Sequence, residues 1–256
     1  MIKNPRLPLK GHKMFNLRSV LTASILAVPV FLTAGMASAA IVTGNSGGTF
    51  SNISNCGGAP NCRINNTVNG NATQLEWGYE NGNNGSPGST LTAVDRSWNV
   101  ATNANDVIMA ELVWFNRPTS DNATPDSFNA NYLLSIIFSS PNASNDQEVF
   151  NLNITNPANP TGDSLSGLLL ADLAGFSFSL NGVTVSDMKY LLDGGAGSTF
   201  NSNIWYNPEN TTSRMYITAD FTNEVPEPGS LVLLSAGLFS VSMLRRRRKH
   251  HTDKQT

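Results

Sequence analysis

Apolar and polar residues alternate over most of the chain between residues 67 and 222, with the period of two that is typical of half-buried β-strands. Successive side chains of a strand point to opposite faces, so each such segment buries one face and exposes the other. The pattern predicts an N-terminal strand or arm around residues 49–53 and about nine further strands. These cover residues 73–79, 90–100, 107–115, 132–139, 148–154, 175–180, 183–192, 204–206 and 214–221.

Turn and helix signals complete this pattern. Asn181 and Gly182 form a two-residue turn signal that predicts a hairpin between residues 175–180 and 183–192. Helical spacing of leucines occurs only at residues 163–174, where we expect one short helix. The sequence therefore predicts an all-β fold over residues 40–222, an antiparallel, jelly-roll-like β-sandwich.

The first 39 residues have a different pattern. Basic residues precede an apolar stretch at residues 20–32, and the small residues Ala37, Ser38 and Ala39 follow. This layout is that of a signal peptide, with cleavage after Ala39 and Ala40 as the first residue of the exported chain. The expected partners are the Sec translocon and signal peptidase.

Two alternatives remain open at this end. Residues 14–39 would form a complete signal peptide by themselves, so Met14 is an alternative start. An uncleaved membrane helix is a second reading, although the apolar stretch is short and contains Pro29.

The last thirty residues have three parts. Pro226, Glu227 and Pro228 come first, an apolar run at residues 230–244 follows, and a basic cluster ends it. As a helix the run would span about 22 Å, less than a hydrocarbon core of about 30 Å. The cluster would remain on the cytoplasmic side of the membrane. It consists of Arg245, Arg246, Arg247, Arg248 and Lys249.

This tail, residues 223–256, closely resembles the PEP-CTERM sorting signal of Gram-negative bacteria. The resemblance implies that a membrane-embedded exosortase recognises Pro226, Glu227 and Pro228 and cleaves nearby. The protein would be held in the inner membrane before processing and reach the cell surface or exterior afterwards. The alternative is an ordinary single-pass anchor with a stop-transfer cluster. Under either reading, residues 223–229 would be an exposed linker.

Removal of both ends changes the charge of the chain. Residues 40–225 hold 5 basic and 16 acidic residues, a net charge of −11, against −2 for the whole chain. Such a surface repels nucleic acid. The three histidines lie at positions 12, 250 and 251, so residues 40–225 contain none, which excludes Ser-His-Asp chemistry and His-ligated zinc there.

The only two cysteines, Cys56 and Cys62, flank a turn-rich loop. In an exported chain this arrangement predicts a disulfide. The closed loop is small, so we expect a stabilisation of roughly 2 kcal/mol.

Four segments of the body resemble the THxN family of PEP-CTERM proteins, whose domain is related to choice-of-anchor K. Val113 and Trp114 replace the threonine and histidine of that family, whereas Asn116 and Pro118 follow the pattern. The resemblance implies a surface domain and carries no reaction. The matching segments are residues 71–78, 112–118, 178–192 and 209–212.

Aromatic residues offer one candidate binding site. Trp77, Trp98, Trp114 and Trp205 form a sugar-stacking platform if they are exposed, or part of the core if they are buried. Trp114 and Phe115 are adjacent, so only one of these two side chains can face the core.

Acidic residues offer two further candidates. Asp121 and Asp126 share a polar loop with the oxygen ligands that calcium prefers, as do residues 146–148, but solvated turns explain both loops equally. A glycosidase needs only carboxylates, which Glu76, Glu111 and Glu209 could supply. Glu76 and Glu111 fit equally well on polar strand faces.

The sequence as a whole predicts an exported, non-enzymatic protein of the cell surface or extracellular matrix, with a structural or adhesive role and without a cofactor. A carbohydrate-binding module of the exopolysaccharide matrix is the second hypothesis. A carboxylate-dependent glycosidase is the third.

Overall fold

The structure is a computed structural model. It describes residues 40–56, 61–68, 72–78, 88–118, 126–158, 160–223 and 237–238. The predicted signal peptide, the Pro-Glu-Pro motif and the basic cluster lie outside these residues. No helix among the described residues is long and apolar enough to cross a membrane.

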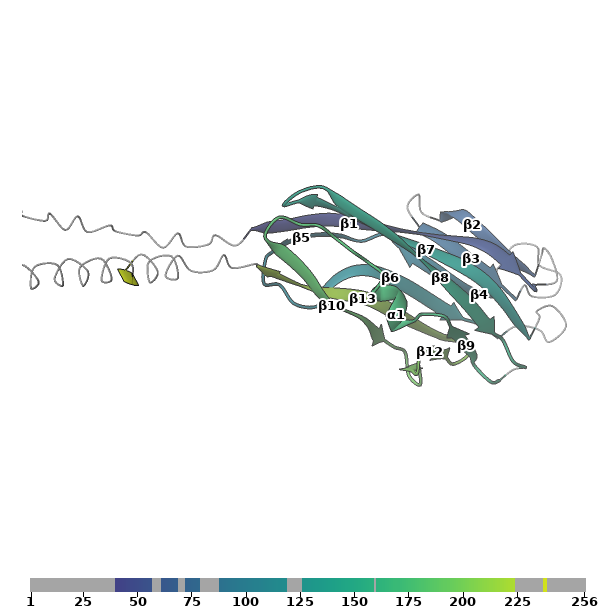
Figure 1. Ribbon diagram of the computed structural model, residues 1–256. Coiled ribbons are helices and arrows are strands. Elements are labelled where there is room, and N and C mark those ends of the chain that lie inside the picture. Colours follow the sequence, from purple (N-terminus) through teal and green to yellow (C-terminus); the bar gives the residue numbers. More distant parts are fainter. Residues whose placement is uncertain are drawn as a thin grey trace, which may run out of the picture. The chain divides into compact units, whose positions relative to one another are not determined.

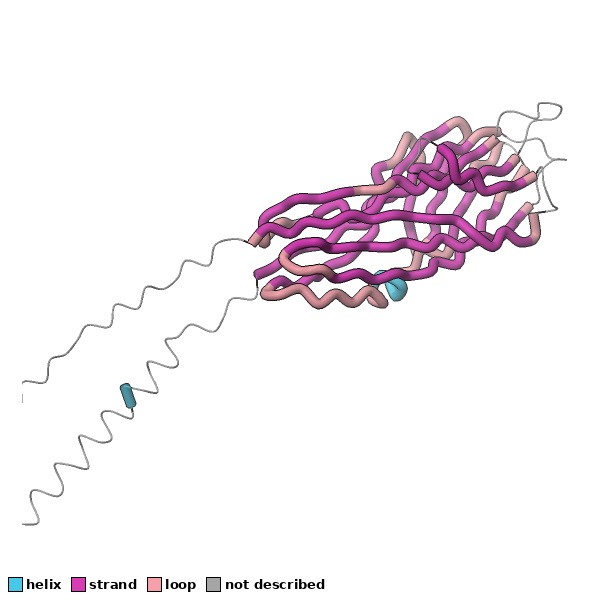
Figure 2. Tube along the Cα trace, turned by 90° about the horizontal axis from the view of Figure 1, so that it is seen from above, coloured by secondary structure: helices cyan, strands magenta, loops and turns pink. Residues whose placement is uncertain are grey.

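Two antiparallel sheets pack face to face, which confirms the predicted β-sandwich (Figure 1; Figure 2). Sheet A has the strand order β11-β12-β9-β8-β7-β1-β5. Its strands are β1 (Ile41–Ser54), β5 (Ser97–Ala101), β7 (Ser127–Ser140), β8 (Ser144–Thr155), β9 (Asp163–Ser166), β11 (Thr199–Asn201) and β12 (Ile204–Asn207).

Sheet B has six strands in the order β10-β13-β6-β4-β3-β2. They are β2 (Cys62–Val68), β3 (Ala72–Trp77), β4 (Ser89–Val94), β6 (Val107–Asn116), β10 (Val183–Asp193) and β13 (Thr211–Asn223). Every strand pairing in both sheets is antiparallel.

The alternating pattern explains why the two sheets pack together. Along β7 every second residue from Phe128 to Phe138 is buried, and Phe150, Leu152 and Ile154 continue this apolar face on β8. The inner face of sheet B supplies the matching residues, such as Leu112 on β6. Burial of these faces is the main driving force for the sandwich.

Aromatic rings form the centre of the core. Trp77, Trp114 and Trp205 are completely buried, and the Trp114 ring lies 5.1 Å from that of Trp205 in an edge-to-face arrangement. Trp98 packs edge-on against Phe138 with ring centroids 5.4 Å apart. The cysteines are also buried, and Cys56 and Cys62 form the predicted disulfide with Cα atoms 6.0 Å apart.

Two of the predicted elements are only partly confirmed, because each is divided in the structure. Residues 90–100 form β4 and β5, which belong to different sheets, with a turn at Asp95 and Arg96 between them. The expected helix at 163–174 is instead β9 and the four-residue helix α1 (Leu170–Leu173).

The predicted hairpin across Asn181 and Gly182 is wrong. Only Leu180 and Val183 form an isolated bridge there. Side chains of β8 bind the segment that precedes the turn, since Asp146 accepts from the backbone N–H of Ser177 at 2.7 Å and Ser144 from that of Ser179 at 3.2 Å. Residues 175–180 therefore lie beside β8 without becoming a strand.

The turn between β5 and β6 joins the first and last residues of the sandwich. The backbone N–H of Thr102 donates to the carbonyl of Ala40 at 2.8 Å, and that of Asn103 to Phe221 at 2.7 Å. The Asn103 side chain accepts from the N–H of Asn223 at 3.3 Å. Strand β1 therefore begins, and β13 ends, at the same end of the sandwich (Figure 1).

Gly44 on β1 tests how closely its neighbours on β5 and β7 pack against this strand. A Cβ at this position would lie 2.4 Å from Trp98 and 2.5 Å from the carbonyl oxygen of Ile137. We predict that Gly44→Ala lowers the free energy of unfolding by about 1–3 kcal/mol, the usual cost of overpacking. Urea denaturation measures this change.

Gly47→Ala is the matched control, because a Cβ there would come no closer than 3.7 Å to any other group. It should change stability by less than about 1 kcal/mol. Equal effects of both substitutions would contradict the packing described for Gly44.

Candidate functional site

The predicted sorting residues are not part of the described structure. Pro226, Glu227, Pro228 and the cluster from Arg245 to Lys249 lie outside it, as do Ala37 and Ala39. Ala40 is described and lies directly before β1. The sorting and signal-cleavage sites therefore remain predictions.

The tryptophan platform expected from the sequence is not available at the surface. Trp77, Trp114 and Trp205 have no exposed area, and Trp98 is 6% exposed. A buried ring cannot stack on a sugar. The rings fill the core instead, and Phe115 rather than Trp114 is directed to the outside of sheet B.

The predicted calcium site is only half described. Asp121 lies outside the described residues, and Asp126 is exposed directly before β7. The second candidate is not a loop, since residues 146–148 lie within β8, where Asp146 accepts hydrogen bonds from the backbone N–H groups of Gln147 and Ser177. That carboxylate therefore holds the segment beside β8.

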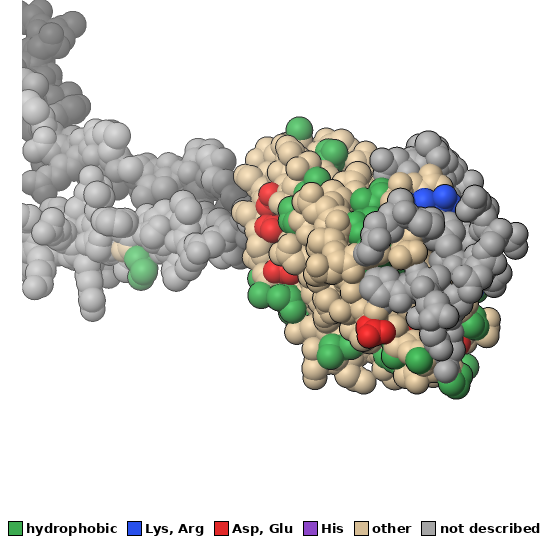
Figure 3. Space-filling view, turned by 90° about the vertical axis from the view of Figure 1, so that its right-hand side faces the viewer, with side chains coloured by type: hydrophobic (Ala, Val, Ile, Leu, Met, Phe, Trp, Pro, Cys, Tyr) green, Lys and Arg blue, Asp and Glu red, His purple; other side chains and the backbone are tan. Residues whose placement is uncertain are grey.

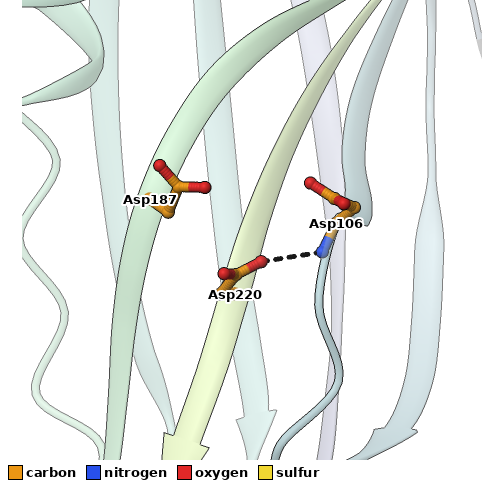
Figure 4. Close-up of side chains that lie close together, drawn as sticks. All are labelled: Asp106, Asp187 and Asp220. Carbon is orange, nitrogen blue, oxygen red and sulfur yellow. Dashed lines mark hydrogen bonds between the residues drawn. The ribbon is translucent and has the colours of Figure 1, made fainter.

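Three carboxylates that the sequence did not bring together lie side by side, those of Asp106, Asp187 and Asp220 (Figure 4). The backbone N–H of Asp106 donates to Asp220 at 2.8 Å. Lys189 binds both Asp106 and Asp187 with its ammonium group, each at 2.7 Å. These hydrogen bonds raise the pKa of Lys189, which supplies one positive charge to the three carboxylates.

Two further carboxylates, Glu76 and Glu111, are almost completely buried on the outer face of sheet B. Arg63 donates to Glu76, and Asn65 lies 3.4 Å from the same carboxylate. Glu111 accepts from both Arg96 and Arg214. The arginine partners offset the desolvation cost of burying these two carboxyl groups, so both have a clear structural role.

A buried carboxyl group, Asp163, accepts a hydrogen bond from the indole N–H of Trp77 at 3.2 Å. Burial raises the pKa of Asp163 to about 8, the Trp77 hydrogen bond lowers it, and the nearby charge of Glu209 raises it. Both carboxylate oxygens of Glu209 are buried and accept no hydrogen bond from described residues. Burial raises the pKa of Glu209 as well.

Amide and hydroxyl groups continue this network between the sheets. Asn116 donates to the carbonyl of Asn207 at 2.8 Å and accepts from the Ser89 hydroxyl at 2.8 Å. Trp205 donates to Ser213 at 3.0 Å. Asn116 and Trp77 belong to two of the segments that resemble the THxN family, and here both hold the core together. No sequence pattern points to Asp163, because its partner is 86 residues away.

A cleft of about 360 Å³ lies between residues 176–180 and strand β10. Phe176 and Phe178 line one side with stacked rings 5.8 Å apart, and Val185 and Met188 line the other. The described lining contains no carboxylate and mixes these apolar side chains with the polar residues Ser179 and Thr184.

Comparison with known proteins identifies the tail. Residues 224–249 match the model of the PEP-CTERM protein-sorting motif. This motif implies that the protein is exported and processed by exosortase at the membrane. No curated protein and no solved structure matches the chain. The resemblance of the body to the THxN family remains a prediction.

The buried carboxyl of Asp163 predicts a pH-dependent stability. The unfolded chain loses this proton near pH 3.8, whereas the native state retains it up to about pH 8. The native state therefore binds more protons in this range, and the free energy of unfolding falls as pH rises from about 4 to 8. The slope can reach roughly 1.4 kcal/mol per pH unit.

Asp163→Asn should flatten this slope, because an amide oxygen can still accept from Trp77 but does not ionise. Urea denaturation at several pH values measures the effect. Asp163→Ala is the comparison, since it leaves the buried Trp77 N–H unpaired and should cost about 1–3 kcal/mol. An unchanged slope in Asp163→Asn would refute the assignment.

Proposed function

We propose that the chain is an exosortase substrate whose sandwich is a non-enzymatic cell-surface or matrix domain with a structural or adhesive role. The observation that carries the proposal is the position of the motif. The last residue of β13 is Asn223, and the matched sorting motif begins at residue 224. The folded domain and the sorting signal thus follow each other without overlap.

The junction limits where processing can occur. Glu224 and Val225 alone separate Asn223 from Pro226. Three Cα-to-Cα steps reach at most about 11 Å, even in a fully extended chain. A protease that binds Pro226–Pro228 must therefore work close to the end of the sandwich that carries the turn at residues 102–106.

The sandwich supports a structural rather than catalytic role. Its buried carboxylates Glu76 and Glu111 are bound by arginines, and Asp163 is bound by Trp77. Glu209 accepts no hydrogen bond from described residues, but a glycosidase would need two carboxyl groups free to act on one bond. The proposed role of the domain is therefore to be displayed at the cell surface or in the matrix, without catalysing a reaction.

Alanine substitution of Pro226, Glu227 and Pro228 together tests the recognition role. We expect this variant to accumulate uncleaved in the inner membrane, because the protease loses its recognition residues. Asp253→Ala, in the tail but outside the matched residues, is the control and should be sorted normally. Immunoblots of membrane and secreted fractions report the outcome. Normal release of the triple variant would overturn the proposal.

The short junction leads to a second prediction. Deletion of Glu224 and Val225 places Pro226 directly after Asn223, which is still paired with Val183. We expect cleavage to slow at least about tenfold, because the protease would have to break the end of β13 first. Pulse-chase labelling measures the rate.

Replacement of the two deleted residues by Gly-Ser is the control and should restore the rate, since only length is required. A deletion variant cleaved as fast as the unaltered chain would show that the protease does not approach the sandwich.

A further inference from the structure

The basic residues of the sandwich are concentrated on one surface. Residues 40–225 contain only five, and all four arginines lie on the outer face of sheet B. Arg63 extends from β2, Arg214 from β13, Arg96 from the β4–β5 turn, and Arg117 follows β6. We call this surface the arginine face. In a domain of net charge −11 such a concentration is not expected from composition alone.

The strand register places these side chains outside the core. On β13, Ser213 and Met215 are buried, so Arg214 and Tyr216 are directed outward. Tyr216 is paired with Glu111, and Arg214 with Val113. Both Arg96 and Arg214 bind the buried Glu111, which anchors their side chains while leaving them 37% and 45% exposed.

Aromatic rings hold two of the guanidinium groups. Arg117 lies 4.7 Å from the centre of the Phe115 ring, and Arg96 lies 6.0 Å from that of Tyr216. Such contacts restrain long side chains and reduce the entropy lost when a ligand binds. Arg117 has no carboxylate partner among the described residues, so its charge is available to a ligand.

Charges on this surface do not cancel. Four guanidinium groups face the two buried carboxylates Glu76 and Glu111, and exposed Asp193 lies beside Arg214 as its neighbour on β10. The balance over these residues is one positive charge. Further along the same outer face, Lys189 lies among the clustered carboxylates of Asp106, Asp187 and Asp220, so the excess is confined to the part of the face that carries the arginines. On the end shown in Figure 3, basic side chains appear in one small area.

The dimensions fit an extended polymer. Val113 and Arg117 are four residues apart, about 13 Å along β6. Arg63 and Arg214 lie on strands separated by four strand spacings, about 19 Å across the sheet. Thr92 and Gln74 lie between them in register and are hydrogen-bonded at 2.9 Å. These groups can bind hydroxyls, whereas the planar guanidinium fork suits carboxylates.

We propose that the arginine face binds an acidic polysaccharide that carries uronic-acid carboxylates. The inference deepens the proposed function, since it names what a displayed domain adheres to, and it relies on export. Nucleic acid is a poorer fit, because a duplex carries one charge per about 1.7 Å of its axis, and the acidic remainder of the domain repels such dense charge more strongly than one carboxylate per sugar.

Isothermal titration calorimetry of the full-length protein tests this, with polygalacturonate as the probe, neutral dextran as the uncharged control and dextran sulfate as a general polyanion. We expect binding to polygalacturonate that weakens with salt, and no binding to dextran. Equal binding of dextran, or equal or tighter binding of dextran sulfate, would overturn the proposal. So would the absence of polygalacturonate binding.

Arg117→Gln should weaken binding at least about tenfold, because it removes a charged hydrogen-bond donor without breaking an ion pair to a described carboxylate. Arg214→Lys keeps a charge near Glu111 but lacks the fork, and should also weaken binding. Lys189→Gln is the charge control, because Lys189 pairs with Thr218, four residues along β13 from Arg214, and is already bound to Asp106 and Asp187; it should stay within about twofold. Equal losses in Arg117→Gln and Lys189→Gln would refute the site.

Thermal unfolding of each variant separates lost binding from lost folding. The titration also separates this inference from the proposed function, because it needs no exosortase. A protein that binds but is not processed would refute the sorting proposal alone. One that is processed but does not bind would refute only the arginine face.

Discussion

Strand β13 is the constraint on which the remainder of the structure depends. It pairs with β10 on one side and β6 on the other, so sheet B is incomplete until the last described strand is in place. Its inward residues Met215, Ile217 and Phe221 belong to the core, and outward Arg214 binds Glu111. The chain then leaves this central strand at Asn223, next to the sorting motif. Folding of the sandwich and presentation of the tail are therefore linked by one element.

Buried carboxyl groups have different partners on the inner and outer faces of sheet B. Between the sheets, Asp163 is held by a neutral indole N–H, and burial favours its protonated form. On the outer face, arginines bind Glu76 and Glu111. The same fold thus keeps a carboxyl group neutral inside and uses arginine-paired ones outside to hold arginines in place. This second arrangement is what gathers the arginines of an acidic domain on one surface.

Alternation of apolar residues was sufficient to predict the sandwich and most strands, because burial of one strand face is a local property of the sequence. It failed where the pattern crosses a turn. Leu91 and Ala93 are inward on β4, but Trp98 is inward on β5, so the parity changes within residues 90–100. Residues 175–180 alternate perfectly, yet side chains of β8 take the hydrogen bonds that a neighbouring strand would supply.

The arginine face could not have been predicted, since Arg214 and Glu111 are 103 residues apart and meet only through strand order. The tail, in contrast, carries its signal in consecutive residues, so the sequence alone revealed it. The tryptophans show the limit of composition. Their number left a surface platform and a place in the core both open, and the structure buries all four inside the sandwich.

Intact-mass spectrometry of the protein recovered from the cell surface or medium tests the central claim most directly. The account predicts a mature chain that begins at Ala40 and ends within or near Pro226–Pro228, without the basic cluster. It also predicts that the longer form accumulates when the exosortase is absent. A surface-exposed protein that retains Arg245 to Thr256 in cells with active exosortase would contradict it.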